Sequence, residues 1–124
     1  MFTHIMVGTN DIQKARLFYD AVFNALGADI GIEVHGRAFY RHGGLGFGVG
    51  APFDGNAASA ANGGTIGFAA PSCAVVDAWH AAGLANGGSC EGLPGHRPQA
   101  PGKTYVAYLR DPDGNKLCVS CQMD

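Results

Sequence analysis

The residues best suited to chemistry lie near the C-terminus, where Cys118 follows a tight turn. An Asp-Pro-Asp-Gly sequence occupies positions 111–114. Proline presets φ for the second turn position, and glycine tolerates positive φ. The flanking runs 106–109 and 117–121 are rich in β-branched, aromatic and sulfur-bearing residues, so we expect two antiparallel strands that meet at this turn. We therefore predict that Cys118 lies close to any functional site.

The chain contains four cysteines, at positions 73, 90, 118 and 121. They are too few for a disulfide scaffold, and we expect reduced thiols in a cytosolic setting. Cys118 and Cys121 have the C-x-x-C spacing of a zinc or redox pair. However, residues three apart on a strand point to opposite faces, and no second C-x-x-C completes a four-ligand zinc site. Buried reduced thiols are the favoured interpretation.

A second group of polar residues lies in the glycine- and proline-rich stretch 93–103. It carries His96, Arg97, Gln99 and Lys103. Because arginine can hold a carboxylate with two parallel hydrogen bonds, a stiff loop of this kind could clamp an anionic or oxygen-rich ligand. A solvated surface loop is the alternative.

The composition favours a small-molecule partner. The chain has 124 residues, of which 47% are hydrophobic and 15% charged, and a formal net charge of −2. It offers no cluster of Lys and Arg for nucleic acid or an anionic membrane, and no apolar run near the roughly 18 residues of a membrane-spanning helix. The first residues lack the pattern of a signal peptide. We expect a cytoplasmic protein with one compact core.

The first half of the chain predicts the element order βαβββ. A strand is expected over Phe2–Val7, followed by a helix that Asn10 caps, with Gln13 at the capping-box spacing and Gly27 as the stop. Apolar residues recur at helical intervals between these ends and form one stripe. Three short strands should follow, at 30–34, 38–41 and 45–49.

The same order returns in the second half. We interpret residues 1–51 as module 1, 52–64 as a linker and 65–124 as module 2. Module 2 should contain a helix that begins at Pro71-Ser72, with Trp79 in the core and His80 exposed. Its strands are expected at 65–69, weakly at 89–93, and in the final hairpin, with a loop at 94–102. One common offset aligns the core positions of both modules, which indicates an internal repeat.

This pattern resembles the vicinal oxygen chelate superfamily, which contains the glyoxalase I, bleomycin-resistance and extradiol dioxygenase proteins. The resemblance rests on the two modules, the His-Ile strand at 4–5, the helices with Phe-Tyr-Asp at 18–20 and Val-Asp-Ala-Trp-His at 76–80, and the terminal hairpin. The resemblance covers essentially the whole chain, and the chain resembles small glyoxalase-like proteins most. It implies an α+β fold in which two tandem βαβββ modules curl their mixed sheets into a cup. Family enzymes bind a divalent metal and a substrate with adjacent oxygens there.

The family's metal positions are only partly matched. Its ligands come from the first strand of each module, usually as His, and from the last strand, usually as Glu or His. His4 matches the first position, whereas Thr65 and Cys118 stand at two others. Threonine is a weak neutral ligand, and a thiolate favours Zn²⁺, which usually has three protein ligands in catalytic sites. The resemblance therefore implies a degenerate metal site, and we leave the cofactor unassigned.

The resemblance also implies that His4 and Cys118 lie near each other, because both positions would converge on one metal. Without the metal, an imidazole–thiol pair could lower the pKa of the thiol and create a nucleophile. The alternative is that both residues simply line the cavity wall. For ligand binding we select two polar residues of the 93–103 stretch and two strand aromatics, namely Arg97, His96, Phe47 and Tyr105.

Two functions stay open at this point. One is an enzyme of lyase, isomerase or dioxygenase-like type that acts on a small oxygenated metabolite, with a metal on His4 or a Cys118–His4 pair. The other is a metal-free protein that binds and sequesters a small molecule, as the resemblance to bleomycin-resistance proteins implies. We expect a homodimer in either case, because pairing would cover exposed sheet edges and open mouths.

Overall fold

A computed structural model describes residues 1–99 and 102–123 of the chain. The predicted loop at 94–102 and module 2 include positions 100, 101 and 124, which lie outside the described residues. The elements follow in the order β1 (His4–Gly8), α1 (Ile12–Ala25), β2 (Ile32–Val34), β3 (Arg37–His42), β4 (Leu45–Gly50), β5 (Ile66–Ala69), α2 (Cys73–Ala85), β6 (Ser89–His96), β7 (Thr104–Arg110) and β8 (Lys116–Gln122).

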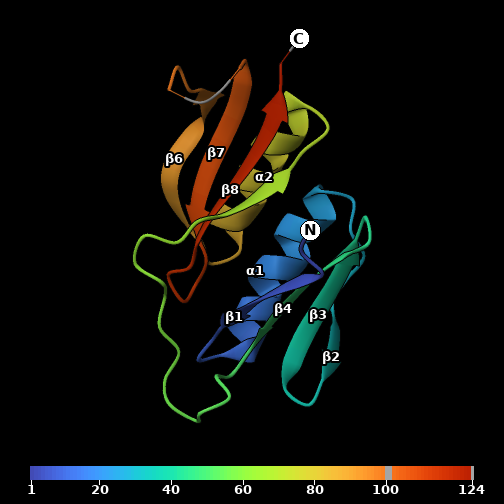
Figure 1. Cartoon of the computed structure of the whole chain (residues 1–124), viewed down its shortest axis with the longest axis vertical. Coiled ribbons are helices and arrows are strands. Elements are labelled where there is room, and N and C mark those ends of the chain that lie inside the picture. The colour runs from blue at the N-terminus through green and yellow to red at the C-terminus, as the bar shows by residue number, and fades with distance from the viewer. Residues whose placement is uncertain (100–101, 124) are drawn as a thin grey trace.

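The two halves of the chain form two similar units, each a sheet with one helix (Figure 1). Strands β1-β4-β3-β2 form sheet 1, and strands β5-β8-β7-β6 form sheet 2. In each sheet the first strand pairs in parallel with the last, and the remaining pairs are antiparallel. The predicted α+β fold of two βαβββ modules is confirmed. Each sheet has a helix face, against which its own module's helix packs, and an open face on the other side.

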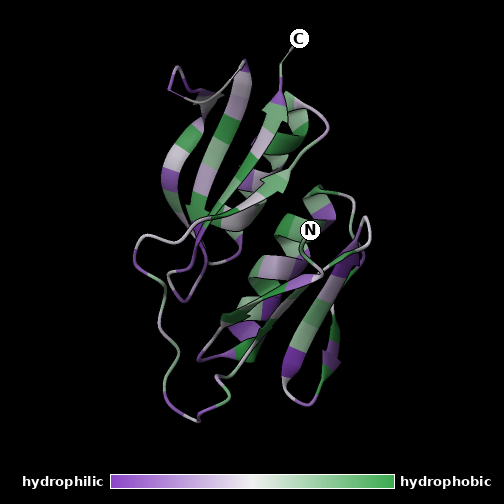
Figure 2. Cartoon of the chain, viewed as in Figure 1, coloured by the Kyte–Doolittle hydropathy of each residue, from purple (hydrophilic) through white to green (hydrophobic). Residues whose placement is uncertain are grey.

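The two helices join the modules by packing against each other (Figure 1). The core consists of side chains from both helices and from the helix faces of both sheets, and it includes the fully buried Phe18, Tyr19 and Trp79. Along β7 and β8, apolar residues alternate with more polar ones (Figure 2). This period of two separates a helix face from an open face. No helix in the described ranges has the length and apolar character that a membrane crossing requires.

The start of α1 differs from the prediction. Asp11, not Asn10, is the N-cap, and its carboxylate accepts hydrogen bonds from the backbone N–H groups of Gln13 and Lys14, both at 3.1 Å. The Asn10 side chain instead holds the segment between the modules: it accepts a bond from the N–H of Ala58 at 2.7 Å and donates to its carbonyl at 3.3 Å. The predicted capping box is therefore wrong, because this segment occupies the Asn10 amide.

Two predictions for module 2 are corrected by the packing of α2 and β6. The strand expected at 89–93 continues to His96, with register shifts on both sides of Gly92. Pro94 is tolerated within it because β6 is an edge strand, where a missing N–H costs no ladder bond. His80 is only 5% exposed, not exposed as predicted. The reason is that α2 directs its imidazole toward Cys90 of β6.

The Asp-Pro-Asp-Gly turn connects the modules as well as the two strands beside it. The buried Asp111 carboxylate accepts a hydrogen bond of 2.5 Å from the Tyr19 hydroxyl of α1. It also accepts bonds from the N–H of Asp113 and from the backbone and side-chain nitrogens of Asn115, at 2.8 to 2.9 Å. Asn115 donates further to the carbonyl of Gly8 in β1, at 3.3 Å. The turn therefore fixes module 2 onto module 1.

The buried tyrosines predict a loss of stability at high pH. Burial, together with Asp111 beside Tyr19 and Asp20 beside Tyr40, raises the pKa of both hydroxyls. In the unfolded chain they ionise near the ordinary pKa of about 10, whereas in the folded chain they stay protonated. The free energy of unfolding should therefore fall above that pH, by up to about 1.4 kcal/mol per pH unit for each tyrosine.

Urea unfolding at a series of pH values between 8 and 11 measures this slope. A variant with both Tyr19→Phe and Tyr40→Phe should show a flatter dependence, because neither ring can then ionise in the unfolded state. An equal slope in the parent and in the double variant would contradict the assignment.

Candidate functional site

The open face of sheet 2 presents Cys118 in a row that crosses all four strands. In the strand register, Gly67 of β5 pairs with Cys118 of β8, Cys118 with Tyr108 of β7, and Tyr108 with Gly92 of β6. Cys121, three residues after Cys118, is buried toward α2, and its sulfur lies 3.5 Å from that of Cys73. The C-x-x-C cysteines thus occupy opposite faces, as their spacing on a strand predicts.

Two cations flank the tyrosine of this row. The Arg97 guanidinium carbon lies 5.8 Å and the Lys116 Nζ 5.4 Å from the centroid of the Tyr108 ring. Both distances suit cation–π attraction. Arg97 Nη2 also donates to the carbonyl of Leu93, at 2.5 Å. We refer to Arg97, Tyr108, Lys116 and Cys118 as the Tyr108 cluster.

Glycines of β6 leave room for the Arg97 guanidinium in this position. A Cβ atom at Gly92 would lie 3.0 Å from Arg97 Nη2, and one at Gly95 would lie 3.2 Å from Nη1. Side chains at these positions would force the guanidinium away from the strand. The two glycines therefore allow the arginine to reach the Tyr108 ring from the edge of sheet 2.

The Cys118 thiol is half-buried within this row. Burial raises its pKa, and the positive charge of Lys116 lowers it to a smaller extent. A Cβ on Gly67 would lie 3.1 Å from the sulfur. The thiol is thus held in its protonated form at neutral pH, which does not favour nucleophilic chemistry at this position.

A groove of about 550 Å³ lies between the modules. Its wall is formed by β1, the end of α1, β3 with the turn into β4, and β5. Apolar side chains dominate it, and the Phe68 ring centroid lies 5.3 Å from that of Phe23 and 5.8 Å from that of Phe47. Its polar residues include His4, Arg41, His42 and Thr65. Gly67 also lines the groove, and Cys118 lies beside Gly67 on the next strand. Because the groove lies between the two modules, we call it the intermodule groove.

His4 and Cys118 lie on different sheets. His4 is exposed on β1 of sheet 1, and its Nδ1 lies 2.8 Å from the hydroxyl of Thr3. Cys118 lies on β8 of sheet 2. The hydrogen bonds of the described residues include none between the two side chains.

The family's metal positions do not assemble into a complete ligand set. His4 and Thr65 both line the intermodule groove. Cys118 lies on the neighbouring strand, with its sulfur against Gly67. Within residues 1–99 and 102–123, no three His, Cys, Asp or Glu side chains come close enough to hold a metal ion. One imidazole and one neutral hydroxyl in the groove, with a thiol on the next strand, do not supply the three strong protein ligands of a catalytic divalent metal site. We therefore derive no step through a metal.

The other predicted site residues occupy different surroundings. Phe47 is 6% exposed on the helix face and contributes one wall of the groove. The Tyr105 hydroxyl donates to Asp77 of α2 at 2.7 Å, on the face away from Cys118. His96 is exposed and donates through Nδ1 to the carbonyl of Thr104 at 3.2 Å. Of the four residues selected for ligand binding, only Arg97 therefore belongs to the Tyr108 cluster.

Sequence reasoning missed Tyr108 and Lys116. The signal was present in the predicted hairpin, because residues two apart on a strand share a face and paired residues lie side by side. Lys116 is two residues before Cys118, and Tyr108 pairs with Cys118 across the hairpin. Counting back from the turn at 111–114 would have identified both.

The open face of sheet 1 carries an apolar row. Ile32 pairs with Phe39, Phe39 with Gly48, and Gly48 with Met6. A Cβ at Gly48 would lie 2.3 Å from the Met6 sulfur and 3.1 Å from the Phe39 ring, so both side chains extend over the glycine. Met6 and Phe39 are 43% and 42% exposed.

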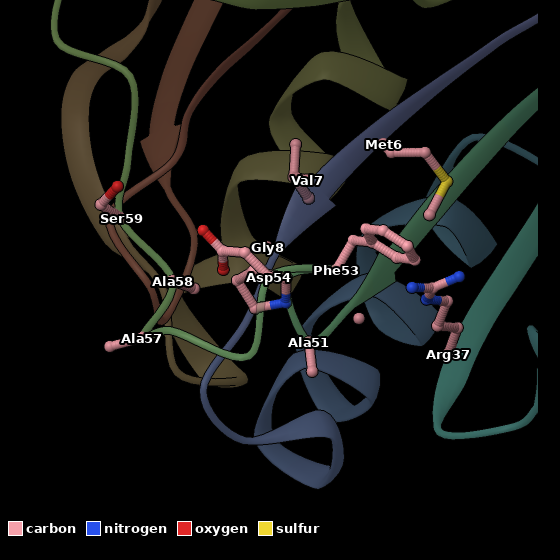
Figure 3. A pocket seen from close by; sticks show the side chains of 12 residues that line it. Met6, Val7, Gly8, Arg37, Ala51, Phe53, Asp54, Ala57, Ala58 and Ser59 are labelled. Carbon is pink, nitrogen blue, oxygen red and sulfur yellow. The ribbon is translucent and has the colours of Figure 1, made fainter.

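A second hollow, of about 540 Å³, lies at the end of this row. It is bounded by β1, Arg37 of β3 and the segment 50–59 (Figure 3). Figure 3 shows the Phe53 ring reaching from this segment toward Met6 and Arg37. Phe53 itself is 97% exposed.

The fold and the sequence together define the family. The chain belongs to the Glyoxalase/Bleomycin resistance protein/Dioxygenase superfamily, whose sequence model matches residues 1–119. The predicted resemblance is thereby confirmed. None of the curated proteins matches the chain.

Solved structures agree with this assignment. A glyoxalase/bleomycin resistance protein from Albidiferax ferrireducens T118 is 50% identical, with 98% of this chain and 99% of that chain covered and a TM-score of 0.94. A glyoxalase-related enzyme from Fulvimarina pelagi is 17% identical, with 98% and 88% covered and a TM-score of 0.78. A family enzyme from Burkholderia phytofirmans PsJN is 18% identical, with 98% of each chain covered and a TM-score of 0.73. The last two share the fold.

Proposed function

We propose that the protein binds a small anionic molecule across the intermodule groove and the Tyr108 cluster. The groove would take the apolar part of the ligand, and the cations would hold its anionic oxygens. The observation that carries the proposal is the pair of cations on the Tyr108 ring, two strands away from the groove. Since neighbouring strands lie about 4.8 Å apart, the two parts are separated by roughly 10 Å, a span that a compact ring-bearing metabolite covers. Apolar pockets with a few convergent polar groups are the usual form of small-molecule sites.

The charge around the proposed site supports an anionic ligand. Arg97 and Lys116 lie by the Tyr108 ring, and Arg41 lines the intermodule groove. In the described part of the chain none of them forms a salt bridge, whereas Arg110 pairs with Glu91. The whole chain nevertheless carries a net charge of −2. Positive charge is therefore concentrated where an anion would bind.

Binding is favoured over thiol catalysis by the state of the two predicted catalytic residues. The raised pKa of Cys118 keeps its sulfur protonated, and His4 bonds to Thr3 instead of to that sulfur. The enzymatic alternative, a lyase- or isomerase-type reaction on an oxygenated metabolite, needs a base or a metal that these residues do not supply within one chain. A metal-free binding protein of bleomycin-resistance type is the function that we propose.

A fluorescence titration with 1-anilinonaphthalene-8-sulfonate tests this proposal, because the probe combines aromatic rings with one anionic group. Arg97→Gln and Lys116→Gln should each weaken its binding about tenfold, since a hydrogen bond to a charged group contributes about 1.5 to 3 kcal/mol. Lys14→Gln, which removes an equal charge from the exposed side of α1, should leave the affinity unchanged.

N-phenyl-1-naphthylamine, which has the same rings without the sulfonate, is the matched neutral probe. Its affinity should not respond to Lys116→Gln. If Lys14→Gln and Lys116→Gln weaken the anionic probe equally, the effect is a general one of net charge and the proposed site is wrong.

We further propose that two copies of the chain pair in solution through the open face of sheet 1. The apolar row of Met6, Phe39 and Ile32 is continued by Val34, which is 46% exposed. Exposed apolar rows of this kind usually mark a binding surface, and a second copy would cover this row.

Light scattering coupled to gel filtration tests the pairing. The parent protein should have the mass of a dimer, and Phe39→Lys should shift it to a monomer, because a third cation between Arg37 and Arg41 on the same face of β3 would be buried unpaired in the interface. Leu17→Lys is the matched control, since Leu17 is 65% exposed on α1 and outside the row. A monomeric parent protein, or equal dissociation by both variants, would contradict the proposal.

A further inference from the structure

A thiol with an imidazole partner lies on the helix face of sheet 2, apart from the Tyr108 cluster. His80 Nε2 of α2 lies 3.2 Å from the Cys90 sulfur of β6. Cys90 is exposed, whereas His80 is only 5% exposed. We propose that Cys90 is a nucleophile that small uncharged electrophiles modify, with His80 as the base that takes the thiol proton. This site is independent of the proposed ligand-binding function.

The strand register places the Cys90 sulfur between α2 and solvent. Cys90 pairs with Leu109 of β7, and Leu109 is fully buried under α2. Cys90 therefore points to the helix face, but β6 is the edge strand of sheet 2, so no further strand covers it. The three preceding residues, at 87–89, are Gly-Gly-Ser and add little bulk. An electrophile can thus approach from outside while the imidazole stays fixed on the inner side.

The surroundings of His80 keep its imidazole in the form that accepts a proton. Burial lowers the pKa of His80, and the carboxylate of Asp77, one helical turn earlier, opposes this effect to a smaller degree. The Asp77 carboxylate itself accepts a hydrogen bond from the Tyr105 hydroxyl. A neutral imidazole can accept the S–H proton through Nε2, and the nucleophile of cysteine chemistry is the resulting thiolate.

Charge near the pair selects the class of electrophile. Asp77 lies on the His80 side, one helical turn before it. Its carboxylate disfavours the approach of an anion, whereas Glu91, which follows Cys90 in β6, is neutralised by its ion pair with Arg110. We therefore infer that the site prefers uncharged reagents with an activated carbon–carbon double bond.

The reaction with such a reagent balances without a further reactant. The thiol proton moves to His80 Nε2, and the sulfur forms a bond to the terminal carbon of the double bond. In a reagent whose double bond is activated by a carbonyl group, the π electron pair of the double bond moves to the carbon beside that carbonyl. This carbon then takes the proton from His80, which leaves a thioether on Cys90 and a neutral imidazole.

Acrylamide is the probe that tests this site on the intact chain. After a short exposure at neutral pH, peptide mass analysis gives the alkylation rate of each of the four cysteines. Cys90 should react first. In His80→Gln its rate should fall about tenfold or more, the range expected when a positioned base is removed, while the rate at Cys118 stays the same. Cys90→Ser should remove the fast reaction entirely.

A second measurement needs no variant of the buried histidine. The parent chain unfolded in urea exposes Cys90 fully but separates it from His80. If the pair activates the thiol, Cys90 should react faster in the folded chain than in the unfolded one, although it is less exposed. An unchanged rate at Cys90 in a folded His80→Gln variant, or a slower rate in the folded parent chain than in urea, would overturn the proposal.

Discussion

Replacing Asp111 with alanine is expected to lower the free energy of unfolding by about 3 to 5 kcal/mol, the usual effect of removing one partner from a buried charged network. The carboxylate is 4% exposed and accepts bonds from Tyr19 and from two residues of the turn, Asp113 and Asn115. Alanine would leave these donors buried without an acceptor. It would also remove the bond that joins the turn to α1.

Asp113→Ala is the matched control for this measurement, because Asp113 belongs to the same turn. Its carboxylate accepts one bond, from the N–H of Asn10 at 2.9 Å in an exposed setting, so its loss should cost about 1 kcal/mol or less. Urea unfolding of both variants gives the comparison. Equal destabilisation by the two substitutions would show that the Asp111 network does not hold the modules together.

Gly83→Leu is expected to have the second large effect, a loss of about 3 kcal/mol or more, as for severe overpacking of a core. Gly83 lies in α2 where the two helices meet. A Cβ there would lie 2.3 Å from Leu109 Cδ1, 3.2 Å from the Phe18 ring and 3.3 Å from Val22 Cγ1. All three neighbours are fully buried, so a leucine side chain would have to separate α1 from α2.

Ala81→Leu provides the comparison for Gly83→Leu on the same helix. Ala81 is exposed, and leucine is a good helix former, so this variant should keep the stability of the parent within about 0.5 kcal/mol. Thermal or urea unfolding distinguishes the two positions. A Gly83→Leu variant as stable as Ala81→Leu would contradict the close helix packing.

The parts of the fold set by local chemistry could be predicted from the sequence. The turn at 111–114 was recognisable because proline and glycine occupy positions with defined φ requirements, and its strands follow from the residues beside it. The helices followed from their apolar spacing and from Gly27 and Ser72 at their ends. These features depend on neighbours along the chain.

The parts that depend on packing between elements could not be predicted in the same way. The burial of His80 requires α2 to lie on the edge strand β6. Asp11 caps α1 in place of Asn10 because the Asn10 side chain is hydrogen-bonded to the backbone of Ala58. Likewise, Arg97 reaches the Tyr108 ring only because Gly92 and Gly95 leave room for it. In each case two segments far apart in sequence had to be placed before the contact could be known.

The most direct test of the proposed binding site is to map where an anionic ring compound binds. Two-dimensional amide NMR of the labelled protein, titrated with 1-anilinonaphthalene-8-sulfonate, locates the residues whose surroundings change. The largest shifts should fall on Thr65 and Gly67 of the groove wall and on Tyr108 and Cys118 of the cluster. Shifts concentrated instead around Arg37 and the 50–59 segment would place the ligand in the other hollow and contradict the proposal.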